Sequence, residues 1–339
     1  MSAAAETAAL PAEVAAFLAR AGRLDPARSY EAEALTGGVS SDIWRVAQDG
    51  RALCVKRARP KLRTAEDWRA PVERNRYERL WCEVAGARVP GFAPLVLAHD
   101  DAAGLFAMEW LAPDSCRLWK AELAAGRVDP EAAGAVGARL GRLHAATAAE
   151  PALAEAFPTL ELFRALRLDP YLGHLASRRP DLAPRLRALI RETEAARIAL
   201  VHGDVSPKNV LLCPEGPVLL DAECAWWGDP AFDLAFCLNH LLLKAFLAPP
   251  AALAAAFVAF LDAWVEAAPA LGAAPVRRAA ALLPALMLAR VDGKSPVEYL
   301  DTEVKRDRVR RFAAPRILAP PPDPQDVADA WLEEWVDAD

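Results

Sequence analysis

Hydrophobic and polar residues alternate along residues 30–58, which is the pattern of half-buried β-strands. The alternating segments are YEAEAL, DIWRV and RALCVKRA, and they are separated by GGVSS and AQDG. Asp-Gly is a strong signal for a hairpin turn. Two more short strands are predicted near 94–99 and 104–110, with the turn DDAA between them. The first part of the chain is therefore expected to form a small five-stranded sheet.

One helix is predicted within this part of the chain, over residues 70–87. Pro71 suits the first helical position, where its missing N–H is not needed. Apolar side chains recur at helical spacing, at Tyr77, Leu80, Trp81 and Val84. Five strands and one helix would make a compact α+β lobe over residues 1–112.

The pattern changes after residue 112. Residues 115–198 are predicted to be almost entirely helical, and so is the chain from residue 230 onward. Three short strands, IALV, VLLC and PVLLD, stand between these helical regions, and the last of them ends at Asp221. Residues 113–339 are therefore expected to form a larger, mainly helical lobe. The predicted fold class is α+β.

The composition, with 54% hydrophobic and 25% charged residues among 339, is that of a soluble globular protein. The net charge of −6 is concentrated in the last twenty residues, which hold seven acids and no base. No basic face for nucleic acid is predicted. The acidic tail carries Trp331 and Trp335 on one helical face, and they either pack back onto the body or meet a partner subunit.

The six cysteines form no CxxC pair and have no metal-ligand spacing with histidine. They are expected to be reduced, mostly buried thiols. The N-terminal segment lacks a basic region ahead of an apolar stretch, and no apolar run reaches 18 residues. The sequence predicts neither a signal peptide nor a membrane span, and the expected location is the cytoplasm.

Candidate chemistry is concentrated in LVHGDVSPKNVLL, residues 200–212, between two apolar strands. Asp204 and Asn209 are five residues apart in a loop, and Asp221 follows at the end of a strand. Phosphoryl transfer needs a carboxylate that accepts the proton of an attacking hydroxyl, and further oxygen ligands that hold Mg²⁺ on the nucleotide phosphates. Oxygen ligands without thiol or imidazole partners suit a hard cation such as Mg²⁺.

HGDVSPKN followed by LLDAECAWWGDPAFDLA resembles the aminoglycoside phosphotransferase and choline kinase-like family, which includes methylthioribose kinases and other small-molecule kinases. The resemblance extends from about residue 34 to 313, and the order and spacing of these motifs are specific. It implies a bilobed protein-kinase-like fold. The small β-rich N-lobe would bind the nucleotide, and the helical C-lobe would carry the catalytic loop, the metal site and the substrate site.

The resemblance also assigns roles in the catalytic loop. Asp204 corresponds to the catalytic base, and Asn209 and Asp221 correspond to the Mg²⁺ ligands. Glu223 stands where the family often has another acid. It either reaches the metal through water or the substrate directly, or forms a salt bridge in the loop. Two residues are expected to support the loop structurally, His202 and Asp233.

Lys56 lies in the middle of a predicted strand, where an inward-pointing lysine is costly unless it meets an anion. In a kinase-like lobe that anion is the α/β-phosphate of the nucleotide together with a glutamate from a helix. Glu78 is the expected glutamate because NRYERL resembles the helix motif of the family. Glu73 is the alternative, because it aligns better with the apolar positions of the helix.

Two further segments are expected to bind the nucleotide. LTGGVSSDIW is a Gly-rich turn between two strands, and its backbone and serines would cover the phosphates. FAMEWL resembles the hinge between the lobes, where adenine would meet the backbone of Glu109 and Leu111 and lie against Met108. In the Gly-rich turn LTGGVSSDIW, the residues expected to contact the phosphates are Gly37, Gly38, Ser40 and Ser41.

Four residues are candidates for the acceptor site or its surroundings. Trp226 and Trp227 directly follow the metal motif, and they either wall the substrate site or belong to the core. Lys208, beside Asn209, either touches the transferring phosphate or is an exposed lysine. Asp292 lies in a charged loop within helical surroundings.

The sequence thus predicts an ATP- and Mg²⁺-dependent phosphotransferase that acts on a hydroxyl of a sugar, an amino alcohol or a nucleoside-like metabolite. Aminoglycosides are an alternative acceptor, although the slightly basic balance of residues 113–319 does not suit a polycation. Methylthioribose kinases have the loop HGDLHTGS, which has no asparagine at the position of Asn209. A nucleotide-binding pseudokinase scaffold is the other alternative. A protein kinase is disfavoured because DAE replaces DFG.

Overall fold

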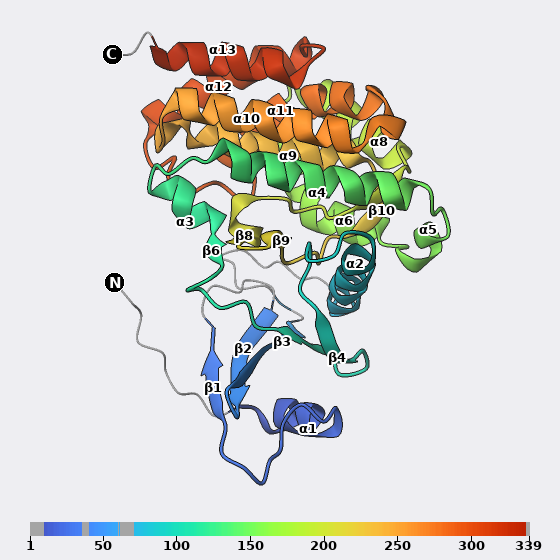
Figure 1. Ribbon diagram of the computed structural model, residues 1–339. Coiled ribbons are helices and arrows are strands. Elements are labelled where there is room, and N and C mark those ends of the chain that lie inside the picture. Colours follow the sequence, from blue (N-terminus) through green and yellow to red (C-terminus); the bar gives the residue numbers. More distant parts are fainter. Residues whose placement is uncertain (1–9, 36–40, 60, 62–70, 337–339) are drawn as a thin grey trace.

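The computed structural model describes residues 10–35, 41–59, 61 and 71–336. Figure 1 shows a small sheet at one end and a larger stack of helices at the other. The sheet is antiparallel, with the strand order β1-β2-β3-β5-β4. Its strands are β1 (Glu31–Ala34), β2 (Ser41–Gln48), β3 (Arg51–Ala58), β4 (Val96–Asp100) and β5 (Leu105–Glu109). The predicted α+β fold class with a five-stranded N-terminal sheet is confirmed.

Two helices accompany this sheet, α1 (Ala12–Arg20) and α2 (Arg74–Arg88). The alternation pattern did not reveal α1, which packs Val14 and Phe17 against apolar side chains of the sheet. Helix α2 begins at Arg74 rather than near Pro71, because Pro71 lies in the preceding turn and its carbonyl accepts the Arg74 N–H at 3.4 Å.

The rest of the chain is mainly helical. The boundary predicted at residues 112–113 falls between β5 and β6, and it stays a prediction. The shorter α-helices are α3 (Trp119–Ala124), α5 (Leu153–Ala156), α6 (Leu160–Phe163) and α7 (His174–Arg178). The longer ones are α4 (Pro130–Ala148), α8 (Ala183–Ala195), α9 (Pro230–Leu243), α10 (Pro250–Ala267), α11 (Ala274–Asp292), α12 (Glu303–Leu318) and α13 (Pro324–Val336). A π-helical segment, η1 (Arg164–Gly173), and three 3₁₀ turns complete the set: η2 (Pro207–Asn209), η3 (Lys244–Phe246) and η4 (Pro269–Leu271).

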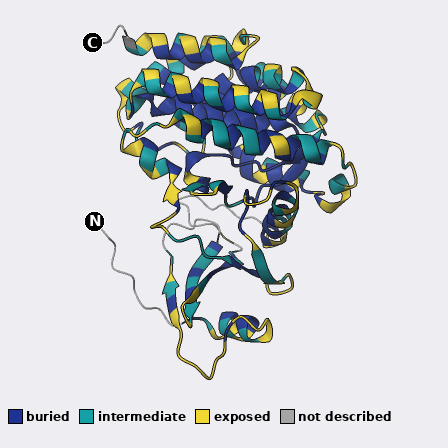
Figure 2. Ribbon diagram, viewed as in Figure 1, coloured by how far each residue is buried: buried dark blue, intermediate teal, exposed yellow. Residues whose placement is uncertain are grey.

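Helix α9 is the centre of this helical part, and every residue in it is buried (Figure 2). A helix that is apolar nearly all round belongs in a core. Among the described residues, α10 alone is long and apolar enough to cross a membrane by length and composition. It lies close against α4, because a Cβ added at Gly137 of α4 would stand 2.1 Å from the Phe260 carbonyl oxygen of α10.

Short strands join the helices near the sheet. β7 (Ala199–Val201) pairs with β10 (Trp226–Gly228), and β6 (Arg117–Leu118), β8 (Val210–Cys213) and β9 (Gly216–Leu219) form a second small sheet. The strand predicted to reach Asp221 ends two residues earlier. The loops after β7 and before β10 are therefore brought side by side, because the two strands are antiparallel partners.

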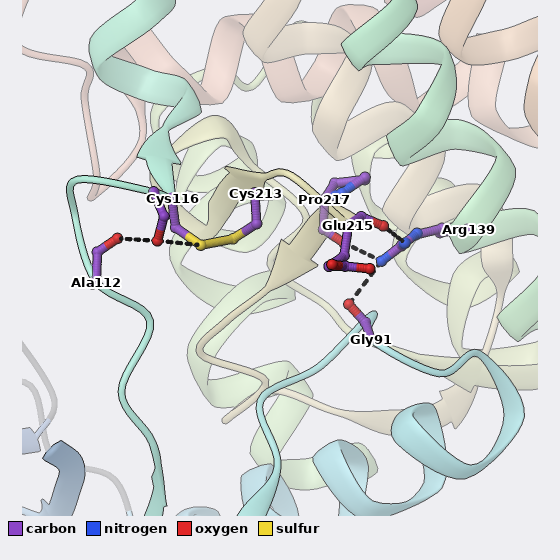
Figure 3. The surroundings of a disulfide bond; sticks show 8 residues. Gly91, Ala112, Cys116, Arg139, Cys213, Glu215 and Pro217 are labelled. Atoms are coloured by element: carbon purple, nitrogen blue, oxygen red, sulfur yellow. Dashed lines mark hydrogen bonds between the residues drawn. A yellow bond between two sulfur atoms is a disulfide. The ribbon is translucent and has the colours of Figure 1, made fainter. Parts of the chain in front are cut away.

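Two of the cysteines form a disulfide, Cys116–Cys213, so the prediction of reduced thiols is wrong for this pair. Figure 3 shows the bond beside the hydrogen bonds of Arg139, which holds the β8–β9 turn and Gly91 through backbone carbonyls. The two cysteines are 97 residues apart in sequence, and the pairing of β6 with β8 places them opposite each other. No local spacing could have revealed this pair. The other four, Cys54, Cys82, Cys224 and Cys237, are free and buried.

The acidic tail packs back onto the body as α13, which lies at the far end from the sheet (Figure 1). Trp331 is fully buried, and its Nε1 donates a hydrogen bond to the Leu242 carbonyl at 2.8 Å. The Trp335 ring lies against Phe246, with ring centres 4.7 Å apart. The first of the two alternatives for these tryptophans therefore describes the structure.

Candidate active site

The predicted catalytic loop follows β7 and turns sharply at Gly203. This glycine has φ +80°, and an added Cβ would stand 2.8 Å from the Cys224 carbonyl oxygen. A residue with a side chain would meet both backbone strain and a clash there. The turn directs His202 and Asp204 into the interior, where both are almost fully buried.

Asp233, in the first turn of α9, holds the backbone of this loop. Its carboxylate accepts the N–H groups of His202 and Gly203, both at 2.8 Å. Its Oδ2 also lies 3.2 Å from His144 Nε2, while Trp264 Nε1 donates to His144 Nδ1 at 3.1 Å. These contacts are the kind of loop support that the sequence suggested for Asp233.

The His202 ring bridges the two loops. Its Nδ1 accepts the Asp204 N–H at 3.1 Å, and its Nε2 lies 3.1 Å from the Leu220 carbonyl oxygen. Burial lowers the pKa of His202 below its usual value, and this effect outweighs the nearby carboxylates. A neutral imidazole that accepts at one nitrogen and donates at the other satisfies both contacts.

One carboxylate oxygen of Asp204 is surrounded by nitrogen donors. Its Oδ2 lies 2.7 Å from Arg167 Nη2, 3.0 Å from Lys208 Nζ and 2.9 Å from Asn209 Nδ2. Its Oδ1 is buried and has no hydrogen-bond partner among the described residues. Burial raises the pKa of Asp204, but the charges of Arg167 and Lys208 outweigh this and hold the pKa below its usual 3.8. The carboxylate is therefore ionised at neutral pH, and no donor of the described residues competes for its Oδ1.

Arg167 is the residue at this site that sequence reasoning missed. It lies in η1, a π-helical segment interrupted by Pro170, which cannot donate a backbone hydrogen bond. Its buried guanidinium contacts Asp204 and donates through Nε to the Gly203 carbonyl at 2.7 Å. It stands 37 residues before Asp204 in a helical, Arg-rich stretch, so no local motif distinguished it from surface arginines.

Lys56 links the sheet to the loops of the helical part. Its Nζ lies 2.5 Å from Glu78 Oε1 in α2 and 2.8 Å from Asp221 Oδ1. Of the two glutamates that the sequence left open, Glu78 contacts Lys56, whereas Glu73 is exposed just before α2. Burial raises the pKa of Glu78 to about 7 in spite of Lys56. Burial by itself would raise the pKa of Asp221, but the charges of Lys56 and Lys208 outweigh it and hold this pKa well below the usual range.

The two predicted metal ligands suit a hard cation bound with phosphates. Asn209 donates its amide N–H group to Asp204, and its Oδ1 accepts no hydrogen bond among the described residues. Asp221 has φ +68°, a strained backbone conformation that is found most often at functional sites. The described residues hold no cluster of three His, Cys, Asp or Glu side chains around one point. Mg²⁺ is usually held by one or two protein oxygens, with phosphates and water completing its shell, so this donor set fits it.

The remaining candidates near the metal motif are engaged elsewhere. Glu223 accepts a hydrogen bond at 3.0 Å from Arg74 Nε of α2, which matches its salt-bridge alternative. Trp226 and Trp227 belong to the hydrophobic core and do not line the cavity beside Asp204, so the alternative of core packing describes them. Asp292 is the last residue of α11 rather than part of a loop, so that placement was wrong. It lies 2.8 Å from Arg310 of α12, also away from that cavity.

Only part of the predicted nucleotide segment can be placed. Gly37, Gly38 and Ser40 lie outside the described residues, and Ser41 is buried at the start of β2. Met108 forms a small apolar cluster with Cys54 and Phe106 on one side of the sheet. The two residues whose backbone is expected to meet adenine, Glu109 and Leu111, are partly exposed.

A cavity of about 220 Å³ opens beside Asp204, and Lys208 lines it as well. Side chains of α3, η1, α9, η3 and α11 and of residues 295–299 form its other walls. Adjoining loops bring together an ionised Asp204, the pair Asn209 and Asp221, and the Lys56–Glu78 ion pair. This is the arrangement that phosphoryl transfer requires.

The chain matches the phosphotransferase enzyme family over residues 31–270, and it belongs to that family. The predicted family and the predicted enzyme class, a phosphotransferase, are confirmed at this level. Among the curated relatives, a methylthioribose kinase of Yersinia enterocolitica is 25% identical over 249 residues, which are 65% of this chain and 62% of that protein. A methylthioribose kinase of Pectobacterium carotovorum is 26% identical over 57% of this chain and 54% of its own length. The chain thus spans 54–62% of the length of these two relatives.

Solved structures show the same fold. An amicoumacin kinase in complex with AMP-PNP, Ca²⁺ and Ami is 15% identical, with a TM-score of 0.56 over 95% of this chain and 100% of that one. A choline kinase from Cryptosporidium parvum is 9% identical, with a TM-score of 0.51 over 96% of this chain and 94% of that one. The predicted bilobed, protein-kinase-like fold is therefore confirmed.

Proposed function

We propose that the protein transfers the γ-phosphate of ATP to a hydroxyl group of a small molecule, in a reaction that requires Mg²⁺. The observation that carries the proposal is the ionised, buried Asp204, which lines a cavity and has one oxygen without a hydrogen-bond partner. A hydroxyl bound in this cavity would donate its proton to that oxygen.

Each residue of the site has a part in this reaction. Asp204 orients the hydroxyl and takes its proton as the hydroxyl oxygen bonds to the γ-phosphorus. The bond from phosphorus to the β-phosphate oxygen breaks, and ADP leaves. Lys56, held by Glu78 and Asp221, binds the α/β-phosphates and reduces their negative charge. Arg167 holds the Asp204 carboxylate in its ionised form.

Asn209 and Asp221 would hold the Mg²⁺, which when bound neutralises charge on the nucleotide phosphates. A nucleotide with a divalent cation is supported by the amicoumacin kinase structure, which holds AMP-PNP and Ca²⁺. Adenine would meet the backbone of Glu109 and Leu111 beside Met108. The phosphates of the nucleotide would lie near Ser41 at the start of β2.

The acceptor is a sugar, an amino alcohol or a nucleoside-like metabolite. Methylthioribose, a sugar derivative, is included because curated relatives are methylthioribose kinases. Aminoglycosides remain the alternative acceptor. A cytoplasmic location and the absence of a nucleic-acid or membrane partner stay predictions from the sequence.

The test is Mg²⁺-dependent release of ADP from ATP with a panel of sugars, amino alcohols, nucleosides, methylthioribose and aminoglycosides. Asp204→Asn should lower kcat by a factor on the order of 10³, because general-base catalysis typically contributes 10²–10⁴. AMP-PNP should still bind to this variant. Asp262→Asn, an exposed aspartate in α10, is the matched control and should keep the wild-type kcat.

Two results would contradict the proposal. If ATP does not bind, the nucleotide assignment is wrong. If ATP binds and Asp204→Asn leaves acceptor-stimulated ADP release unchanged, Asp204 is not the base. The absence of any Asp204-dependent turnover, with intact ATP binding, would favour the pseudokinase alternative.

A further inference from the structure

The cavity beside Asp204 is lined by more positive than negative side chains. Among the described residues, its carboxylates are Asp204 and Glu298. Its lysines and arginine come from four separate elements, α3, η2, η3 and α11. These four cations are Lys120, Lys208, Lys244 and Arg290.

Two of the four cations have carboxylate partners inside the cavity. Lys208 Nζ lies 3.0 Å from Asp204 Oδ2, and Lys120 Nζ lies 2.6 Å from Glu298 Oε1. The charges of these pairs cancel. The excess positive charge therefore belongs to Lys244 and Arg290.

Lys244 is buried without an anion. Its exposed fraction is 3%, and no carboxylate of the described residues lies within ion-pair distance of its ammonium group. Its Nζ lies 4.2 Å from the centre of the Tyr299 ring. Burial lowers the pKa of Lys244 to about 8, so the group still carries a charge at neutral pH. A buried charge of this kind is costly until an oppositely charged group joins it.

Arg290 supplies the second unpaired charge from α11. Its Nη1 donates to the hydroxyl groups of Tyr171 at 2.8 Å and Ser295 at 3.0 Å, neither of which is charged. Its Nε is buried and has no hydrogen-bond partner, and the same holds for the Tyr299 hydroxyl. A guanidinium N–H and a phenol O–H are both donors that an oxyanion accepts.

His240 of α9 shows that the four positive charges converge on one region. It lines the same cavity. Burial lowers the pKa of His240 well below its usual value, and the charges of the same four cations lower it further. The imidazole is therefore neutral at physiological pH and does not add to the excess positive charge.

We propose that the acceptor is an anionic alcohol whose carboxylate or phosphate group binds between Lys244 and Arg290 while its hydroxyl lies against Asp204. This inference rests on the proposed function and names the chemical class of the acceptor at the same site. Carboxylates and phosphate esters share the oxyanion that these donors recognise.

The charge of the cavity decides against the other acceptor classes. A polycationic aminoglycoside would bring positive charges next to two cations that already lack carboxylate partners, which costs free energy in a partly desolvated site. A neutral sugar would leave Lys244 buried and unpaired. An anion satisfies both Lys244 and Arg290. The rings of Tyr171, Phe236 and Tyr299 provide apolar walls for the carbon skeleton.

The first test compares acceptors that differ in one terminal group. Gluconate, glucitol and glucamine share a carbon chain and end in a carboxylate, a hydroxyl and an ammonium group. Ribose 5-phosphate and ribose form the phosphate arm. Methylthioribose and kanamycin are added as further neutral and cationic compounds. The kcat/KM of the preferred anion should exceed that of its neutral and cationic counterparts at least tenfold. Preference for a neutral or cationic acceptor over every anion would overturn the proposal.

The second test removes the charge of Lys244. Lys244→Gln should raise the KM of the preferred anionic acceptor about tenfold or more, since a charge-assisted hydrogen bond is lost, and leave the KM of ATP within about twofold. Arg187→Gln, which removes an exposed charge from α8, is the control and should leave both constants unchanged. If Lys244→Gln weakens neutral and anionic acceptors equally, Lys244 is structural and the proposal fails.

A binding measurement decides the case in which no acceptor of the panel is phosphorylated. The nucleotide site is first saturated with Mg²⁺ and AMP-PNP, and inorganic phosphate or acetate is then titrated into the protein in a calorimeter. Binding to the wild type that Lys244→Gln abolishes supports the anion site, and phosphate and acetate distinguish the two chemical sources. No binding at concentrations of about 10 mM, where even millimolar affinity would be visible, overturns it. Failure to bind AMP-PNP would instead count against the proposed function, and the anion titration would still test this cavity.

Discussion

The two sides of Asp204 differ in how their charges are balanced. On the side proposed to bind the nucleotide, Lys56 lies between Glu78 and Asp221, so its charge is already compensated by the protein. On the acceptor side, Lys244 and Arg290 have no carboxylate partner in the described part of the chain. The positive charge on the first side is balanced by carboxylates before a ligand binds, and the positive charges on the second side are not.

This difference suits the two sides to the two kinds of ligand proposed for them. A compensated lysine is fixed in position by its partners and can meet a phosphate without rearrangement, which is the usual basis of electrostatic preorganisation. A pair of cations without carboxylate partners, of which Lys244 is buried, gains most of its stabilisation from the ligand itself. Substitutions on the two sides should therefore affect different kinetic constants.

The largest effect is expected at Arg167, which contacts Asp204 between the two sides. Arg167→Met would leave the Asp204 carboxylate buried without its nearest cation. Loss of one partner of a buried pair typically lowers the free energy of unfolding by about 3–5 kcal/mol. Urea unfolding at pH 7 measures this change. Arg167→Lys keeps the charge and should recover part of the loss, whereas equal losses in both variants would show that packing rather than charge matters.

The same variant should change the pH dependence. The pKa of Asp204 is held below its usual 3.8, so the unfolded chain binds the proton more readily than the folded one. The stabilisation from ionised Asp204 is thus present above about pH 4 and is lost as the pH falls through the folded pKa. In Arg167→Met the pKa should rise, and the acidic limb of kcat against pH should move to higher pH. An unchanged limb would show that Arg167 does not control the ionisation of Asp204.

The next effect belongs to the nucleotide side. Lys56→Met should lower kcat/KM for ATP by about 10²–10³, the usual cost of removing one charge that stabilises the transition state. The KM of the acceptor should change little. Arg57→Gln is the control in the same strand, because Arg57 pairs with Asp42 and Glu13 away from Lys56. A change in acceptor KM as large as the change for ATP would break the separation of the two sides.

The sequence could single out the residues proposed for the nucleotide side because they stand in short motifs. Asp204 and Asn209 are five residues apart, and Asp221 follows after one strand and turn. Lys56 was recognisable as a lysine in the middle of an alternating strand. The β-strands were visible for the same reason, since alternation is a local property of the chain.

The acceptor side could not be predicted because it is assembled from distant elements. Lys120, Lys244 and Arg290 come from α3, η3 and α11, and each is an ordinary residue in an Arg- and Ala-rich helical sequence. The contact of Arg167 with Asp204 and the Cys116–Cys213 bond were not predicted for the same reason. Their partners are chosen by helix packing and strand pairing over long sequence separations. The slightly basic balance of residues 113–319 was the one sequence signal of this charge, and it could not locate the cavity.

A smaller effect is expected at the disulfide, which holds the segment before α3 to the end of β8. The double substitution Cys116→Ala and Cys213→Ala should lower the free energy of unfolding by about 2–4 kcal/mol, because the bond closes a long loop. It should raise the KM of the acceptor more than that of ATP, since α3 carries Lys120. Dithiothreitol should reproduce the loss in the wild type and have no effect on the double variant. Equal stability of the wild type with and without reductant would contradict the bond.

The smallest predicted effect is a pH dependence on the acceptor side. Burial lowers the pKa of Lys244 to about 8, so the free site loses this positive charge as the pH rises above that value. If the anion binds the protonated form, its KM should rise about tenfold per pH unit above pH 8, which corresponds to about 1.4 kcal/mol per unit. Bound anion itself favours the protonated lysine, so kcat should be less affected. KM for ATP measured over the same pH range is the internal comparison.

The other groups that face Lys244 do not explain a rise in the KM of the anion that begins near pH 8. The pKa of His240 lies well below the usual value for histidine, and burial raises the pKa of Tyr299 far above its own. Glu298 is held below its usual pKa by Lys120, which opposes the effect of burial, so it is already ionised. Lys244→Arg keeps a positive charge at all these pH values and should flatten the KM profile of the anion. If the rise persists in Lys244→Arg, the titrating group lies elsewhere, and the contrast between a compensated and an uncompensated side of the site loses its kinetic support.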